Sequence, residues 1–281
     1  MPSCHKDKTA DAVHRMESCL HKVVKWMSAN RLKLNPDKTE VMWFSSLIGL
    51  KKYERPSITF QGFTITPKSN VRLLGVELDE SLTMEKQVQG LCRSCFFQLR
   101  QIRHVRCFLN VENIKLLVSP YILSKIDYCN SLLANLPMVL LTQLQRVLNS
   151  AARTVLGLSR SVYDLRPHIR DSLHWLRIQE RINYKLCLLA YKSLNGLAPP
   201  YISDLCTLQS SRSGRHNLRS ANNRILYVPR YKLNTMGKRS FSVAGPTAWN
   251  RLPAQLRSYD LNCHNFCTAL KSHLFVISYD L

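Results

Sequence analysis

The sequence has few glycines, few acidic residues and no apolar run long enough to cross a bilayer. Nine glycines and twelve prolines among 281 residues exclude a collagen-like or low-complexity chain. No uninterrupted apolar stretch approaches the roughly 20 residues that a spanning helix needs. The first fifteen residues lack the apolar core of a secretory signal peptide, so we expect an intracellular protein that is not secreted.

The usual catalytic signatures are also missing. The chain has no GxxxxGK[ST] phosphate loop, no GxGxxG, no HExxH and no GxSxG. A two-metal phosphoryl-transfer site needs several carboxylates close together, and the only adjacent acidic pair is Asp79-Glu80. We therefore predict no catalytic residue, no metal ligand, no cofactor and no small-molecule substrate for this chain.

The ten cysteines do not form a complete metal-binding pattern. Cys92 and Cys95 make the only CxxC, and Cys263-His264 with Cys267 resembles part of a zinc knuckle. The remaining ligands of a tetrahedral zinc site are missing from both segments. The cysteines are therefore predicted to be reduced thiols without metal.

Basic residues far outnumber acidic ones. The chain carries 40 Lys+Arg and 18 Asp+Glu, for a net charge of +22. From Leu205 to Tyr259 there is no acidic residue, although the stretch holds ten basic ones. Such an excess favours a polyanionic partner, because lysine and arginine release counterions when they meet phosphates. An anionic membrane surface, or a merely solvated basic surface, is the alternative.

Two sets of arginines are candidate phosphate contacts. The first lies in the acid-free stretch, among turn-forming residues that also fit a solvated loop: Arg212, Arg215, Arg219 and Arg224. The second follows a predicted helix over 84–105: Arg93, Arg100, Arg103 and Arg106.

Apolar periodicity predicts an α+β fold in which the strands come early. A helix over 10–30 precedes two strands around the Asn35-Pro36-Asp37 turn, a hairpin near 58–65 and one strand over 71–78. Helices are expected over 84–105, 111–133, 140–156, 175–194, 239–250 and 262–275. The predicted regions are 1–80, 81–198 and 199–281.

Several segments resemble the C-terminal part of a reverse transcriptase from non-LTR (LINE-type) retrotransposons. WMSANRLKLNPDKTEVMWF (Trp26–Phe44) is similar to the palm segment after the catalytic Asp-Asp motif, and VRLLGVELDESL (Val71–Leu82) is similar to the primer-grip hairpin. LVSPYILSKIDYCNSLLANLP (Leu117–Pro137), LQRVLNSAARTVLGL (Leu144–Leu158), LAYKSLNGLAPPYISDL and FSVAGPTAWNRLPAQLR resemble the helical region after the palm. The resemblance covers nearly the whole chain after Thr9.

The resemblance implies a truncated palm remnant over 1–80, a thumb-like helical region over 81–198 and a basic C-terminal region. It would bring Lys38 near an incoming triphosphate and Gly75 near the primer end. The family's catalytic Asp motifs are expected upstream of this chain, so Mg²⁺ is expected only in the intact RNA-directed DNA polymerase.

The predicted function is sequence-tolerant binding of RNA and DNA by an inactive reverse transcriptase fragment. The alternatives are a non-catalytic module that binds a protein partner, and a translated retroelement relic without a selected role. A membrane partner is not expected.

Overall fold

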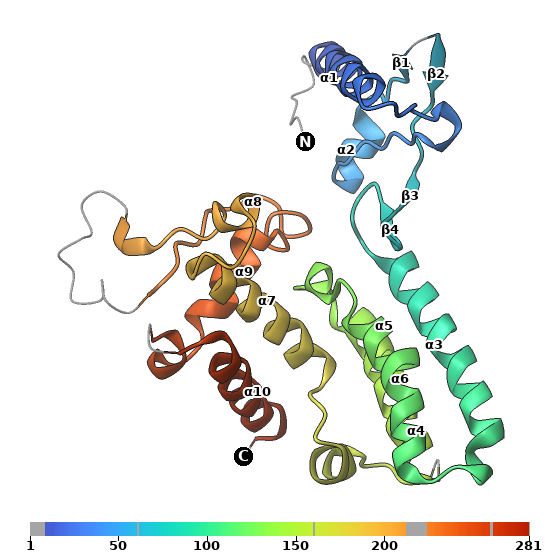
Figure 1. Cartoon of the computed structure of the whole chain (residues 1–281), viewed down its shortest axis with the longest axis vertical. Coiled ribbons are helices and arrows are strands. Elements are labelled where there is room, and N and C mark those ends of the chain that lie inside the picture. The colour runs from blue at the N-terminus through green and yellow to red at the C-terminus, as the bar shows by residue number, and fades with distance from the viewer. Residues whose placement is uncertain (1–8, 61, 160, 212–223, 259–260, 281) are drawn as a thin grey trace. The chain divides into compact units, whose positions relative to one another are not determined.

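The computed structural model describes residues 9–60, 62–159, 161–211, 224–258 and 261–280. The fold is mixed α+β and mostly helical, with two small antiparallel hairpins (Figure 1). The chain divides into two compact units, residues 1–86 and residues 87–281. The three regions predicted from the sequence stay a prediction.

In the first unit, one helix packs against one hairpin. The predicted helix is confirmed as α1 (Thr9–Ala29), and the predicted hairpin as β1 (Ile58–Phe60) and β2 (Phe63–Ile65). Ile58 and Phe60 of β1 are buried, and the Phe60 ring lies 5.4 Å from that of His21 on α1. The apolar stripe of α1 is nevertheless poorly covered, since Trp26 is 62% exposed.

The two strands predicted around Asn35-Pro36-Asp37 are wrong. The segment forms a 3-10 turn, η2 (Pro36–Lys38), in which the Asn35 side chain accepts a hydrogen bond from the Asp37 backbone at 3.0 Å. Just beyond the turn, Val41 makes an isolated bridge with Pro67. A local Asn cap satisfies the turn by itself, so the flanking apolar residues need no strand pairing. A short helix, α2 (Leu47–Lys52), was not predicted.

The single strand predicted over 71–78 is in fact a hairpin. β3 (Asn70–Leu73) and β4 (Val76–Asp79) pair antiparallel, with Leu73 opposite Val76. Leu74 and Gly75 form the two-residue turn, with φ of 47° and 83°. Both angles lie in the left-handed region that such tight hairpin turns require, and Gly75 adopts it without steric cost.

Helices make up the second unit. α3 (Glu85–Val105), α6 (Met138–Leu156), α7 (Ile178–Leu194), α9 (Phe241–Asn250) and α10 (Cys263–Tyr279) confirm the helices predicted there. Short helical segments connect them: η3 (Arg106–Phe108), α4 (Val111–Val118), η4 (Ser119–Leu123), α5 (Ser124–Asp127), η5 (Asn130–Leu133), η6 (His168–Leu173), α8 (Pro200–Ser203), η7 (Gln209–Ser211) and η9 (Ala254–Arg257).

The continuous helix predicted over 111–133 is wrong. α4 passes into the π-helical turn η4 at Ser119-Pro120, and α5 ends before Tyr128. Pro120 has no backbone N–H to donate to the preceding turn, which accounts for the wider turn there. Cys129 then takes φ of 51° and separates α5 from η5.

The core of the second unit gathers around α6 and α7. Leu144, Val147 and Leu148 of α6 are fully buried. α7 packs against α9 and α10, where the Tyr191 and Phe266 rings stack with centroids 4.2 Å apart. Burial of this apolar surface is the main stabilising contribution to the helical unit.

Candidate nucleic-acid interface

Four arginines line an open groove of about 760 Å³ in the second unit. Arg100 and Arg103 belong to α3, Arg106 to η3, and Arg153 to α6. No aspartate or glutamate is among the described residues that line the groove. Four guanidinium groups without a carboxylate create a local positive potential that attracts anions.

Two hydroxyls and one backbone carbonyl of α6 hold two of these arginines in place. Arg103 donates through Nε to Thr154 Oγ1 at 3.1 Å and through Nη2 to Ser150 Oγ at 2.6 Å. Arg106 donates through Nε to the Thr154 carbonyl oxygen at 2.9 Å. The hydroxyls and the carbonyl orient the two guanidiniums, and none of these three acceptors carries a full charge.

Arg153 approaches the groove from the opposite helix. Its Nη2 donates to the Val162 carbonyl at 3.0 Å, while its Nε is buried and has no hydrogen-bond partner among the described residues. A buried donor without a partner is costly, so a ligand oxygen or a water at this position is favoured. Arg153 therefore has donor capacity that the described chain does not use.

Gly157 also lines the groove. It caps the C-terminus of α6 with φ of 69°, and a Cβ there would lie 2.0 Å from Arg106 Nη2. The left-handed backbone favours glycine here, and an added Cβ would also displace the guanidinium end of the flexible Arg106 side chain. Phe96 lies at the groove with 42% of its surface exposed, as an aromatic face beside the cations.

The structure brings together only part of the predicted site. Arg100, Arg103 and Arg106 share the groove, whereas Arg93 is exposed on α3 outside its lining. In the first unit Lys38 is exposed in η2, and Gly75 is at the tip of the β3–β4 hairpin.

The prediction that Arg224 contacts phosphate is wrong, because Arg224 does not belong to an open surface. Its side chain is 2% exposed, and it donates to the Ser258 carbonyl at 3.1 Å and to Asn195 Oδ1 at 3.2 Å. A phosphate cannot reach a guanidinium that the protein encloses in this way. The other three arginines of that set, Arg212, Arg215 and Arg219, lie outside the described residues.

The sequence prediction missed the contribution of α6. Arg153 was not singled out, and neither were the two hydroxyl residues, Ser150 and Thr154, that hold Arg103. Their spacing of three and four residues was the available signal, since it places all three on adjacent turns of one helix. That these residues lie beside α3 depends on tertiary packing, which the sequence does not show.

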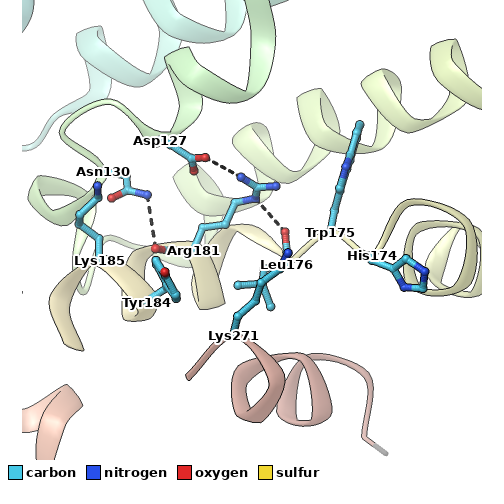
Figure 2. Close-up of a pocket in the computed structure, with 9 residues that line it drawn as sticks. All are labelled: Asp127, Asn130, His174, Trp175, Leu176, Arg181, Tyr184, Lys185 and Lys271. Atoms are coloured by element: carbon cyan, nitrogen blue, oxygen red, sulfur yellow. Dashed lines mark hydrogen bonds and ion pairs between the residues drawn. The ribbon is translucent and has the colours of Figure 1, made fainter. Parts of the chain in front are cut away.

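A second pocket of about 310 Å³ was also missed. Figure 2 shows Asn130 and Lys185 at one end of it, Trp175 and His174 at the other, and Arg181 between them. Arg181 forms an ion pair with Asp127 at 2.7 Å. Its elements, η5, α7 and α10, lie far apart along the chain, so no local motif marks it.

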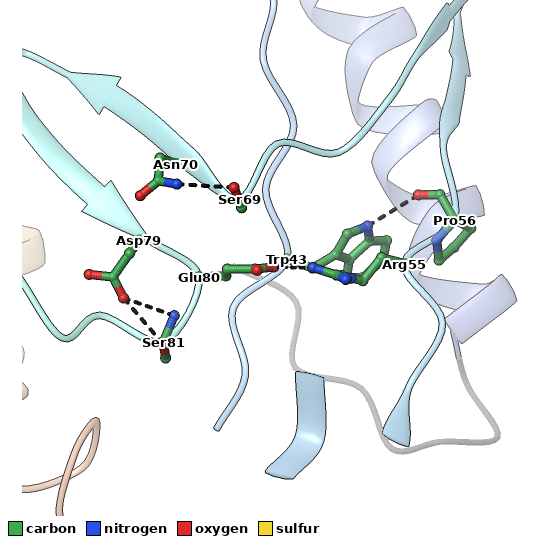
Figure 3. A network of polar contacts seen from close by, with 8 residues as sticks. All are labelled: Trp43, Arg55, Pro56, Ser69, Asn70, Asp79, Glu80 and Ser81. Carbon is green, nitrogen blue, oxygen red and sulfur yellow. Dashed lines mark hydrogen bonds and ion pairs between the residues drawn. The ribbon is translucent and has the colours of Figure 1, made fainter. Parts of the chain in front are cut away.

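The adjacent acidic residues, Asp79 and Glu80, make hydrogen bonds and an ion pair within the first unit. Asp79 accepts hydrogen bonds from the backbone of Thr83 and Met84, both at 2.8 Å. Glu80 instead pairs with Arg55 at 2.5 Å (Figure 3). Burial by itself would raise the pKa of Asp79, but these hydrogen bonds outweigh it and leave the pKa below its ordinary value. The two carboxylates thus hold different parts of the first unit.

Of the two CxxC thiols on α3, Cys95 is buried and Cys92 is half-buried. Burial raises the pKa of Cys92 and of Cys95 to about 11, which disfavours the thiolate form that binds metals. Over the described part of the chain, no three His, Cys, Asp or Glu residues are grouped closely enough to hold a metal ion.

Among the described helices, none is long and apolar enough to cross a membrane. No protein-family model, curated protein or solved structure matches this chain.

Proposed function

We propose that this chain binds the phosphate backbone of RNA or DNA through the arginine groove between α3 and α6. The observation that carries the proposal is the grouping of Arg100, Arg103, Arg106 and Arg153 around one open groove without a carboxylate. Guanidinium groups bind phosphate oxygens through two parallel N–H donors, a geometry that lysine does not offer.

The binding is sequence-tolerant. Phosphate contacts position a nucleic acid but do not read its bases. Phe96 adds a face on which any base can stack, and such stacking is also indifferent to sequence. The net charge of +22 adds long-range attraction that salt screens.

We further propose that the chain derives from a non-LTR retrotransposon reverse transcriptase, of which it carries the end of the palm and the thumb. This origin rests on the resemblance of segments such as Val71–Leu82 and Leu117–Pro137 to that family. The chain has no Asp-Asp motif. Given a primed RNA template, deoxynucleotides and Mg²⁺, it is therefore expected to extend nothing, and template-dependent extension above a buffer control would contradict this.

One observation favours a protein partner as a second candidate function. Phe97 on α3 and Phe108 in η3 are 57% and 84% exposed. Aromatic side chains are enriched at protein–protein interfaces. A complex with a protein partner that survives high salt would support this function.

The test compares two double variants of equal charge. Arg100→Gln/Arg103→Gln removes two guanidiniums from the groove, whereas Arg230→Gln/Lys232→Gln removes two exposed charges from the acid-free stretch. Fluorescence anisotropy with labelled single-stranded RNA, repeated across a salt series, measures both affinity and salt slope. The groove variant should bind more weakly, with a log–log slope shallower by about 1.4, or about 0.7 for each lost phosphate contact.

The control variant should keep both the affinity and the slope of the unmodified chain. If it loses binding and the groove variant does not, the contact surface belongs to the acid-free stretch and the proposed groove is wrong. Equal losses in both variants would show that only total charge matters.

A further inference from the structure

The pocket between η5, α7 and α10 contains a buried acceptor without a partner. Asn130 is 3% exposed, and its Nδ2 donates to the Arg181 carbonyl at 3.4 Å. Its Oδ1 is buried and has no hydrogen-bond partner among the described residues, although Asn130 lines the pocket. The amide orientation is set by this contact, because only the nitrogen can donate to a carbonyl.

An unpaired buried acceptor calls for a donor. Leaving such an oxygen without a hydrogen bond is costly. Binding of a ligand that places a hydroxyl or N–H there is therefore favourable. The pocket is large enough for this, because its volume of about 310 Å³ exceeds the space of a single water.

The charge of the same pocket is positive. Arg181 is neutralised by Asp127, and its Nε also donates to the Leu176 carbonyl at 2.9 Å. Lys185 and Lys271 line the pocket as well, and no carboxylate among the described residues pairs with either. These two ammonium groups give the pocket a positive charge that an anionic ligand would balance.

We propose that this pocket binds a small phosphate monoester that carries a neighbouring hydroxyl or N–H donor. The phosphate, with a charge between about −1.5 and −2 at neutral pH, meets Lys185 and Lys271. The donor meets Asn130 Oδ1. The site is separate from the arginine groove, since the two share no lining residue, and the inference does not depend on nucleic-acid binding.

Isothermal titration calorimetry of the full chain tests the proposal with three probes. Ribose 5-phosphate supplies the phosphate and hydroxyl donors, inorganic phosphate supplies the anion alone, and ribose supplies the hydroxyls alone. Ribose 5-phosphate should bind with a Kd below about 1 mM, the limit of useful affinity for so small a ligand. Inorganic phosphate should bind at least several times more weakly, and ribose should not bind measurably.

Variants test whether the measured heat of binding arises at this pocket. Lys185→Gln and Lys271→Gln should each weaken ribose 5-phosphate binding about tenfold, the loss expected for one charge-assisted hydrogen bond. Lys192→Gln, two turns from Lys185 on α7 and outside the pocket lining, is the matched control and should bind unchanged. Asn130→Asp keeps the side-chain shape but places a negative charge there, and should abolish binding.

Four results would overturn the proposal. The first is no binding of ribose 5-phosphate, and the second is binding that Lys185→Gln and Lys271→Gln leave unchanged. The third is equal affinity for inorganic phosphate, which would leave Asn130 without a role. The fourth is loss of binding in Arg100→Gln/Arg103→Gln, which would place the ligand in the arginine groove. Because Lys271 is exposed, its replacement preserves the fold even if Asn130→Asp does not.

Discussion

Arg224 and Trp249 hold each other in the core of the second unit. The Trp249 indole N–H donates to the Arg224 carbonyl at 2.7 Å, and the Arg224 guanidinium carbon lies 5.9 Å from the centre of the Trp249 ring. Both residues are almost fully buried. A charge this deep is tolerated because oxygens and an aromatic face surround it.

Replacing Arg224 should therefore affect stability rather than ligand binding. Arg224→Gln removes the cation–π contact and the hydrogen bonds to Ser258 and Asn195, at a cost of about 2–4 kcal/mol in the free energy of unfolding. Urea denaturation measures this loss. Arg230→Gln, an exposed arginine nearby in sequence, should unfold like the unmodified chain. Equal stability of both variants would contradict the assigned role.

Replacing Gly157 should affect both the C-terminal cap of α6 and RNA binding in the arginine groove. Gly157→Ala introduces a Cβ at a left-handed φ and forces Arg106 aside, so we expect a loss of about 1–2 kcal/mol in stability together with weaker RNA binding. Gly196 also has a φ of 68° but has nothing within 4 Å of an added Cβ. Gly196→Ala should lose similar stability and keep its RNA affinity, as measured by denaturation and anisotropy. If both variants bind RNA alike, Arg106 is not a contact.

Asp79 should make the first unit sensitive to acid. Its pKa is lowered in the folded chain, so its contribution is complete above its ordinary pKa of 3.8 and is lost as the pH falls through the lower folded value. Asp79→Ala should cost about 1–3 kcal/mol at pH 7 through its lost hydrogen bonds.

The cost of Asp79→Ala should shrink as the pH falls below 3.8. Circular dichroism during denaturation at pH 7 and pH 3 checks this. Glu54→Ala, an exposed carboxylate of the same unit, is the control and should show no cost at either pH. A cost that is independent of pH would show that Asp79 does not act as a carboxylate.

The thiols should differ sharply in reactivity. Cys19 and Cys107 are exposed, whereas burial raises the pKa of Cys95 to about 11 and that of Cys187 to about 12. With iodoacetamide at pH 8, mass spectrometry should find Cys107 modified in the folded protein, and Cys95 and Cys187 modified only after unfolding. Rapid labelling of Cys95 in the folded state would contradict its burial.

Local patterns were sufficient for the longest elements. α3 and α6 each carry an uninterrupted apolar stripe with polar residues on the other faces, so their period alone indicates a helix. Short apolar segments were ambiguous. The run around Leu74-Gly75 fits one strand as well as a hairpin, and the choice depends on a turn of two residues.

The candidate site was predicted only in part. The periodicity of α3 placed Arg100 and Arg103 on one helix, but Arg93 and Arg224 carry the same charge and only their surroundings distinguish them. Exposure is decided by which elements pack around a residue. Arg224 is enclosed by segments that begin 29 positions before it, at Asn195, and end 34 positions after it, at Ser258.

The sequence by itself determined the basic charge, the amphipathic helices and the lack of known catalytic motifs, because composition and period are properties of neighbouring residues. Tertiary structure alone decided that Arg103 and Arg153 line one groove and that Asn130 and Lys271 line one pocket. The members of these two pairs are 50 and 141 residues apart in the sequence. The groove depends on the contacts of Arg103 and Arg106 with α6, and the pocket on the packing of α7 against η5 and α10. No local stretch of chain encodes such packing.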